Sequence, residues 1–560
     1  MINKEPFIEV NYPKQACWEG WQSIGAELGQ AIRALDKSKV VVAVDCFQGT
    51  YTDINLQALK DVLSPQATIQ ARDLYRSERE IRQLVAQDLD FRTGSARVST
   101  LRIDDYFDPE KLAGICESLD SLQGGVILIH GTGASQITTA DLTIYSDISR
   151  WEILQRFRRN DISNLAVCNE ADSFDRQYQW GYFIDWRICD KIKKQVIGSA
   201  HYFMEANNWQ KPKLALGDAV RSGFEQATRQ PIFMAPFFDP ELWDQESIHE
   251  LNQEDFEWGF NCDIEEDNIL FRISDSLFET PAINLVYHQA ARLLGPAVYR
   301  KFGSEVPVKL NFVDGTEDGN QLSFDVYPGA DHLMDHFGLR YQQVENYYIM
   351  NAKKKARMYV NLKEEASAAA FKQAIDTQMT SEVAALLDSV NLDKHDHLAI
   401  PQETIHSNGH QAIMLHISTA PQIFKSALYR DKDATPRHLP RHEVLINEIS
   451  RTGHYQLVKN AYVRAEGELH EEVLAPEENT QVTISRIWFE RELTLETKDV
   501  FNMFNLIDGK EIIIEGVTGE FKPFTVHYAE TFFIPASIGQ FIIKSSGKSK
   551  TGLLRVVPGV

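Results

Sequence analysis

The N-terminal part of the chain alternates between continuous apolar runs and segments with apolar residues at helical spacing. Residues 39–45 (KVVVAVD) are rich in β-branched side chains and predict a strand buried on both faces. Residues 125–129 (GVILI) repeat this pattern, whereas residues 18–35 and 151–158 show helical spacing. The alternation predicts an α/β domain with a parallel sheet over residues 37–230, preceded by an N-terminal arm and helix over residues 1–36.

After residue 230 the pattern changes to short apolar segments separated by Gly, Pro, Asn and Asp. Many short, evenly spaced strands with turn residues between them are typical of barrels or sandwiches. The similar segments 400–406 and 534–539 indicate two related barrels in tandem, so we expect two all-β barrels with helical insertions over residues 231–430 and 431–560. The expected strands of the first barrel include residues 269–273, 308–313, 322–326, 347–350 and 357–362, with helical insertions at 282–294 and 367–389.

Charge and cysteine content narrow the classes of partner. The formal net charge is −23, which argues against a nucleic-acid groove or an anionic membrane surface as the main partner. The six cysteines form no CxxC pair, as expected for reduced thiols, and no run approaches the ~18 apolar residues of a membrane helix. These features predict a cytoplasmic protein with no nucleic-acid or membrane partner, and they leave small anionic substrates possible.

The α/β segment resembles the nucleoside-kinase fold of the uridine kinase and phosphoribulokinase type. The resemblance rests on residues 126–131 (VILIHG) and on residues 142–147 (LTIYSD), which lead towards Arg156 and Asp161. In such kinases the first strand opens onto a glycine-rich loop that holds the phosphates with backbone amides and a lysine. Here residues 46–51 (CFQGTY) contain one glycine and no lysine. We therefore expect a degenerate kinase-like domain that is structural or binds an effector, without a bound nucleotide.

Four residues of the first expected barrel have the residue types and order of a metal site. Asp325 and Tyr327 are two positions apart, so both project from the same face of a strand. Glu345 follows 20 residues after Asp325, and His406 stands near the end of a later strand. On neighbouring strands of a small barrel, such side chains converge on one point.

This order resembles a cupin metal site, and from about Phe233 the chain is similar to class I mannose-6-phosphate isomerases with two cupin barrels. Further landmarks are residues 395–401 (HDHLAIP), 434–437 (ATPR) and 527–536 (HYAETFFIPA). The resemblance implies a divalent metal, with zinc expected, held by Asp325, Tyr327, Glu345 and His406. It also implies a sugar phosphate as substrate.

The chain departs from the family pattern at three positions. Tyr327 stands where the family has a histidine ligand, His416 where it has a glutamate, and Ala427 where it has a basic residue. Two cations flank Ala427 and are the implied catalytic candidates: Lys425 and Arg430. The implied candidates for holding phosphate or sugar hydroxyls are Ser323, Lys309 and Arg437.

Two functions follow from this set of residues. Interconversion of mannose 6-phosphate and fructose 6-phosphate needs a base to move a proton between C2 and C1, and a metal to stabilise the enediolate. A phenol with a pKa near 10 binds metal less readily at neutral pH than imidazole does. The second hypothesis is a sugar-phosphate-binding or regulatory protein that has lost turnover. Tyr327 is then a core residue, and His416 is either a substitute ligand or a neutral core histidine.

Overall fold

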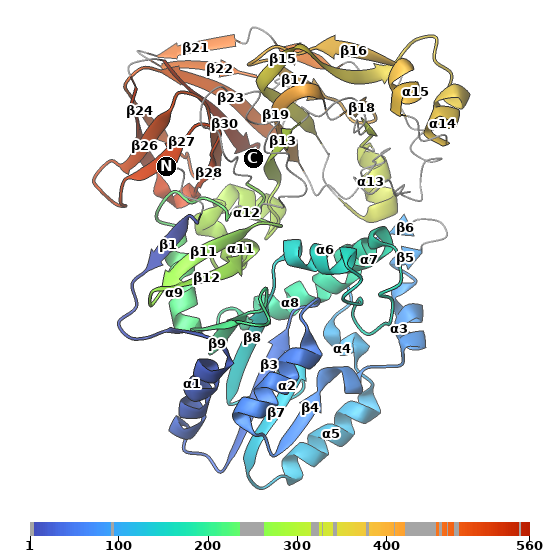
Figure 1. The fold of residues 1–560 in the computed structure, drawn as a ribbon, viewed down its shortest axis with the longest axis vertical. Coiled ribbons are helices and arrows are strands. Elements are labelled where there is room, and N and C mark those ends of the chain that lie inside the picture. The colour runs from blue at the N-terminus through green and yellow to red at the C-terminus, as the bar shows by residue number, and fades with distance from the viewer. Residues whose placement is uncertain are drawn as a thin grey trace. The chain divides into compact units, whose positions relative to one another are not determined.

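The computed structural model describes residues 5–90, 95–235, 262–314, 324–327, 329–339, 344–376, 380–407, 409–419, 455–458, 462–466, 469–474, 481–547 and 550–560. The chain forms two compact units, which are considered separately. The N-terminal unit comprises Pro6–Ala227 and Glu265–Gln289, and the C-terminal unit comprises Thr228–Ile264 and Ala290–Val560 together with Met1–Glu5 (Figure 1). No helix in these described ranges is both long enough and apolar enough to cross a membrane.

A seven-stranded sheet with the order β2-β10-β9-β8-β3-β7-β4 forms the centre of the N-terminal unit. Strands β4, β7, β3, β8 and β9 are parallel, as the alternation of strands and helices predicted, and β10 and β2 add an antiparallel edge. The strands of the sheet are β2 (Cys17–Glu19), β3 (Lys39–Cys46), β4 (Ala67–Gln70), β7 (Gly125–Gly131), β8 (Leu142–Asp147), β9 (Tyr202–Glu205) and β10 (Lys213–Leu216).

Helices α1 (Trp21–Ala34) and α2 (Thr52–Leu63) pack on one face of this sheet. Ile24 and Leu28 of α1 share a buried cluster with alternate residues of β3, such as Val42 and Val44. Alternation along the strand places the intervening residues, including Asp45, on the opposite face. Further helices of the unit are α3 (Glu78–Val85), α4 (Ile103–Tyr106), α5 (Pro109–Ser121), α6 (Arg150–Arg158), α7 (Phe174–Trp180), α8 (Trp186–Val196) and α9 (Gly217–Ala227). Short 3-10 turns η1 (Ala71–Leu74) and η2 (Ala134–Gln136) follow β4 and β7.

Two smaller sheets complete the N-terminal unit. One has the order β1-β11-β12, from β1 (Phe7–Val10), β11 (Asn268–Ile273) and β12 (Ser276–Pro281), and is followed by α11 (Ile283–Leu293). The other is the short pair β5 (Leu89–Asp90) and β6 (Ser95–Ala96). A π-helical turn η3 (Gly181–Asp185) connects α7 to α8.

The first β region of the C-terminal unit is an eight-stranded antiparallel sheet built around the long strand β15 (Glu345–Leu362). Its apolar side forms a core with residues such as Ile349, Met358 and Leu398. The other strands are β13 (Val308–Asp314), β14 (Phe324–Asp325), β16 (Leu387–Asn391), β17 (His397–Ile400), β18 (His406–Ser407), β19 (His410–Thr419) and β20 (Gln456–Val458). Its helices are α12 (Pro296–Phe302), α13 (Ala330–Phe337), α14 (Ala368–Asp376) and α15 (Thr380–Ala385).

The second β region consists of two sheets that share one apolar core. Ile487 and Phe504 from the larger sheet pack in the same cluster as Ile512 and Phe541 from the smaller sheet. The larger sheet has the order β21-β22-β23-β30-β25-β28 and the smaller β24-β29-β26-β27. Their bounds are β21 (Tyr462–Glu466), β22 (Leu469–Val473), β23 (Val482–Phe489), β24 (Glu492–Glu496), β25 (Asn502–Asp508), β26 (Glu511–Gly516), β27 (Phe524–His527), β28 (Thr531–Ile534), β29 (Gln540–Ser545) and β30 (Thr551–Pro558), with the 3-10 turn η4 (Ala536–Ile538).

The multidomain, sheet-rich organisation is confirmed, while the kinase-like and cupin assignments and the four domain boundaries stay predictions. One element is wrong: the helix expected over residues 367–389 ends at Ala385, and residues 387–391 form strand β16 instead. The segment Leu387-Asp388-Ser389-Val390-Asn391 buries Leu387 and Val390, and its pairing with β15 overrides its helical spacing.

Candidate functional site

Two strand pairings place three of the four predicted metal residues in the sheet of the first β region, and Tyr327 follows β14. Asp325 on β14 is the cross-strand partner of His406 on β18, and Glu345 begins β15, opposite Ser418 of β19. Asp325, Tyr327, Glu345 and His406 are all buried. Asp325, Glu345 and His406 belong to strands of one sheet and Tyr327 follows β14, while a shared site for these four residues stays a prediction.

His406 is held on both ring nitrogens by other groups of the chain. Its Nδ1 lies 3.0 Å from the carbonyl oxygen of Thr404, and its Nε2 lies 3.0 Å from the hydroxyl of Tyr347. A carbonyl accepts only, so Nδ1 carries the proton and Nε2 accepts from the phenol. Burial lowers the pKa of His406, although the nearby carboxylate of Asp325 raises it in part. The ring is therefore neutral at neutral pH, with its one lone pair already used.

Glu345 makes a direct contact with His416. The Nε2 atom of His416 meets Oε2 of Glu345, and both side chains are buried. The ring of Tyr347 stacks on His416, with centroids 4.8 Å apart and planes 13° from parallel. His416 was predicted to be either a substitute ligand or a core histidine, and the structure places it as the hydrogen-bond partner of Glu345.

Asp325 and Tyr327 complete the cluster. The Tyr327 ring stacks on His406 with centroids 5.8 Å apart. Burial raises the pKa of Tyr327 well above its usual value, and the carboxylates of Glu345 and Asp325 raise it further. The phenol therefore keeps its proton. The Tyr327 hydroxyl and Oδ1 of Asp325 have no hydrogen-bond partner among the described residues.

The donor atoms of this cluster do not fit a metal ion as they are placed. In the described part of the chain, no three His, Cys, Asp or Glu side chains are grouped so that they hold a metal. The physical reason lies mainly at His406, whose one free lone pair accepts from Tyr347, whereas His416 engages one of the two carboxylate oxygens of Glu345. A metal needs such lone pairs for itself, and a protonated phenol at Tyr327 does not replace them.

The predicted substrate and catalytic residues are only partly described. Lys309, on β13, is buried and forms an ion pair with Asp263, with Nζ 2.6 Å from Oδ2. Its charge is thus balanced within the protein. The other four candidates lie outside the described residues: Ser323, Lys425, Arg430 and Arg437.

Sequence reasoning missed the central residue of the cluster, Tyr347. It contacts both His406 and His416, and burial together with the charges of Glu345 and Asp325 raises its pKa well above the usual value. The available signal was spacing: Tyr347 is two residues after Glu345 and so shares its strand face. His397, which is fully buried on β17, was also not named among the candidate functional residues.

Residues 20–229 match the profile of a protein family described as a domain of unknown function (DUF8485). No curated protein matches the chain. The chain is similar to the mannose 6-phosphate isomerase from Bacillus subtilis, at 15% identity and a TM-score of 0.45, over 58% of this chain and 99% of that chain. It is also similar to a mutant of phosphomannose isomerase from Salmonella typhimurium, at 11% identity and a TM-score of 0.43, over 58% and 98% of the two chains. These similarities assign neither an activity nor a residue role to this chain.

Proposed function

We propose that this protein binds a sugar phosphate in the first of two cupin-like barrels and has lost metal-dependent isomerisation. The observation that carries the proposal is the closed set of contacts around His406. Its two ring nitrogens are bonded to Tyr347 and Thr404, and the carboxylate of Glu345 is bonded to His416.

The electrostatics of the cluster support binding rather than turnover. His406 is held neutral, and the phenols of Tyr327 and Tyr347 keep their protons because burial and neighbouring carboxylates raise both pKa values. Proton transfer between two carbons needs a base whose pKa lies near the working pH and an electrophile for the enediolate. The neutral phenols and the engaged imidazole of His406 supply neither, which leaves the carboxylates of Asp325 and Glu345 as the bases of the cluster.

The ligand class comes from the sequence resemblance to class I mannose-6-phosphate isomerases. Its landmarks are residues 395–401 and 527–536, and they fall in the two antiparallel β regions of the C-terminal unit. Two polar atoms remain for a ligand in the cluster, since Oδ1 of Asp325 and the hydroxyl of Tyr327 have no partner among the described residues. A hydroxyl donor and a carboxylate acceptor are suitable partners for sugar hydroxyls.

The same two oxygens favour a second candidate, the metal-dependent interconversion of mannose 6-phosphate and fructose 6-phosphate. For this candidate, Asp325 and Tyr327 are ligands together with Glu345 and His406. The bonds from Tyr347 to His406 and from His416 to Glu345 then have to open before the metal is held.

A binding and turnover experiment separates these candidates. The protein is mixed with mannose 6-phosphate and fructose 6-phosphate, and both the unfolding temperature and product formation are measured in the presence of zinc, manganese or cobalt. The proposal expects a rise in unfolding temperature without turnover. The Tyr327→Phe variant is expected to bind about tenfold more weakly, the equivalent of one lost hydrogen bond.

The matched control is Tyr359→Phe, which removes a hydroxyl from a half-buried tyrosine of β15 outside the described cluster. It is expected to leave ligand binding unchanged. Turnover that needs both added metal and His406 establishes the second candidate and contradicts the first.

A further inference from the structure

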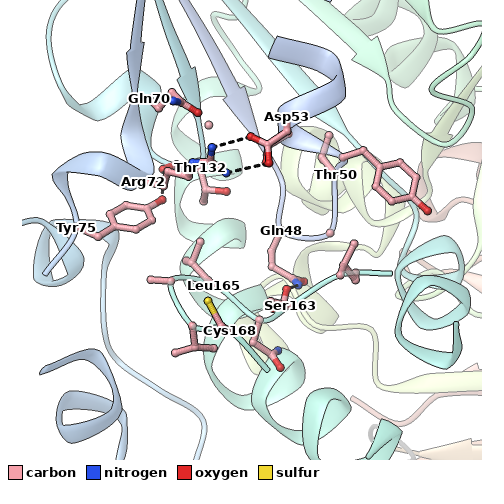
Figure 2. A pocket seen from close by; sticks show the side chains of 18 of the residues that line it. Gln48, Thr50, Asp53, Gln70, Arg72, Tyr75, Thr132, Ser163, Leu165 and Cys168 are labelled. Atoms are coloured by element: carbon pink, nitrogen blue, oxygen red, sulfur yellow. Dashed lines mark hydrogen bonds and ion pairs between the residues drawn. The ribbon is translucent and has the colours of Figure 1, made fainter. Parts of the chain in front are cut away.

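A cavity of about 630 Å³ lies within the N-terminal unit, at the carboxyl ends of β3, β4 and β7. Figure 2 shows it between Gln48 and Thr50 after β3, Arg72 after β4, Thr132 after β7, and Ser163 and Cys168 from the segment beyond α6. Its volume is in the range of cavities that hold small organic molecules, roughly 300–1,000 Å³.

The strand order places a point of diverging connections next to β3, whose carboxyl end also borders the cavity. From β3 the chain continues to β4, which lies beyond β7 on one side of β3. From β8, which lies on the other side of β3, the chain continues away from β3 to β9. The connections therefore diverge between β3 and β8. In open α/β sheets, ligands bind outside the carboxyl ends of the strands where the connections diverge in this way.

Backbone amides next to the cavity have an arrangement that suits a phosphate, but they already donate hydrogen bonds to a side chain of the protein. Oδ1 of Asp45 accepts from the amide of Gly133 at 3.0 Å, and Oδ2 accepts from the amide and the hydroxyl of Ser135 at 2.9 and 2.6 Å. Asp45 is 1% exposed. Successive amides of this kind form an anion-binding nest, and here the buried carboxylate is the anion.

The charges that line the cavity also argue against an anionic ligand. Four carboxylates line it against two guanidiniums, those of Arg72 and Arg76. Arg72 is bound in a bidentate pair by Asp53, with distances of 3.0 and 2.7 Å. Arg76 donates from Nε to the carbonyl oxygen of Asp105. A phosphorylated ligand would meet an excess of negative charge, which raises its binding free energy.

The walls of the cavity are held in place by hydrogen bonds within the unit. Gln48 donates to the carbonyl oxygen of Ser163 at 2.9 Å and accepts from the indole of Trp186 at 3.2 Å. The hydroxyl of Tyr75 donates to the carbonyl oxygen of Thr132 at 2.6 Å. The cavity therefore has a defined shape before a ligand enters, which reduces the entropic cost of binding.

We infer that this cavity binds an uncharged, hydroxyl-rich small molecule that carries no phosphate, with the Asp53–Arg72 pair as its main polar contact. Figure 2 shows Asp53 and Arg72 side by side, joined as an ion pair. A carboxylate and a guanidinium in this arrangement accept from and donate to adjacent hydroxyls. This site is independent of the function proposed for the C-terminal unit, because every residue that lines it belongs to the N-terminal unit.

Cys168 provides a readout in the full-length protein, because it is exposed and lines the cavity. The rate at which N-ethylmaleimide alkylates Cys168 is measured by mass spectrometry. The measurement is repeated in the presence of mannose, glucose, uridine or adenosine, and of the phosphate monoester of each. At least one uncharged probe is expected to slow the alkylation of Cys168. The concentration of this probe that gives half of the maximal protection is expected to be at least about tenfold lower than that of its phosphate ester. Which probe protects separates a free sugar from a nucleoside. Cys116, on α5 and outside the lining, reports general changes in reactivity.

Asp53→Asn is the test variant, because Asp53 is 68% exposed and its replacement leaves the core intact. It is expected to raise the half-saturating concentration at least about fivefold, from the loss of charge-assisted hydrogen bonds. Glu78→Gln, which disturbs the exposed Glu78–Arg82 pair outside the cavity, is the matched control and leaves protection unchanged. Any of three results overturns the inference: the phosphate esters protect Cys168 more strongly than the uncharged probes, no uncharged probe protects it, or protection is the same in Asp53→Asn as in the unmodified protein.

Discussion

Tyr347 decides what its neighbours in the C-terminal cluster are able to do. Its hydroxyl donates to Nε2 of His406, and its ring covers His416. Without this contact, His406 presents a buried lone pair that is available to a metal or a ligand. A single aromatic residue thus converts a set of metal-binding residue types into a closed hydrogen-bond network.

Tyr347→Phe is expected to lower the free energy of unfolding by about 1–3 kcal/mol, because His406 loses its donor in a buried site. Denaturant titration measures this, with Tyr359→Phe on the same strand as the control, expected within about 0.5 kcal/mol of the unmodified protein. Equal stability of Tyr347→Phe and the unmodified protein contradicts a structural role for this bond.

His397 is expected to make the C-terminal unit sensitive to acid. It is fully buried, and neither ring nitrogen has a hydrogen-bond partner among the described residues. Burial and the charge of Arg486 lower its pKa from 6.5 to about 3. Between these values the unfolded chain binds the proton and the folded chain does not, so stability falls as the pH drops below 6.5.

Replacing His397 with leucine is expected to remove this loss. Relative to His397→Leu, the unmodified protein should lose up to about 1.4 kcal/mol of unfolding free energy per pH unit below pH 6.5. Denaturant titrations between pH 7 and pH 4 measure the difference. The exposed His470 of β22 provides the control His470→Leu. Parallel pH profiles for His397→Leu and the unmodified protein would falsify the assignment of the acid sensitivity to His397.

At the scale of elements, the π-helical turn η3 supports one wall of the N-terminal cavity. Its last residue, Asp185, accepts from the side chain of Asn164 at 2.8 Å and from the amide of Leu165 at 3.0 Å. Asn164 and Leu165 both line the cavity. Burial raises the pKa of Asp185 from 3.8 to about 7, although these hydrogen bonds lower it in part. The folded chain therefore keeps the proton over a range in which the unfolded chain releases it.

The pH dependence of Asp185 is opposite in sign to that of His397. Its contribution to stability is complete at low pH and is lost as the pH rises from about 4 to about 7. Asp185→Asn keeps an acceptor but does not titrate, so it should gain up to about 1.4 kcal/mol per pH unit over the unmodified protein across this range. Denaturant titration at pH 4, 5.5 and 7 tests this, and a constant difference at all three values contradicts it.

The turn between β7 and η2 depends on glycine at one position. Gly133 has a φ of +86°, and an added Cβ atom would lie 2.5 Å from Cγ1 of Ile103. Gly133→Ala is therefore expected to cost about 2 kcal/mol or more, since the amide that binds Asp45 has to move. In the control Gly114→Ala, the new methyl meets no atom within 4 Å, and a gain of up to about 1 kcal/mol is expected in helix α5. Thermal unfolding of both variants decides between these outcomes.

The sequence predicted the parallel strands well because β-branched runs such as residues 39–45 are buried on both faces and bounded by turns. It placed Asp325 and His406 in strands, which the structure pairs directly, whereas their joint site with Glu345 came from the family resemblance and stays a prediction. Spacing did not reveal that Tyr347 and His416 bond to these residues, because such contacts depend on the register between strands distant in sequence. The hydrogen bonds from the amides of Gly133 and Ser135 to Asp45 also depend on strand register, here between β3 and β7.

At the scale of the whole molecule, the two proposed binding sites belong to separate units and differ in chemistry. The N-terminal unit has a preformed cavity with an excess of carboxylates, and the C-terminal unit has a buried network of phenols and histidines. The net charge of −23 places both sites in a negative field, so a phosphorylated ligand of the C-terminal unit needs local cations. Arg437, outside the described residues, stays a prediction for this role, and Lys309 is already paired with Asp263.

The amount of zinc bound per chain tests the central claim most directly. The protein is incubated with excess zinc, desalted and analysed by mass spectrometry for metal content, alongside His406→Ala. Because His406 and Glu345 are engaged by Tyr347, Thr404 and His416, we predict far less than one zinc ion per chain and no difference between the two proteins. One tightly held zinc ion per chain that is lost in His406→Ala would contradict the account.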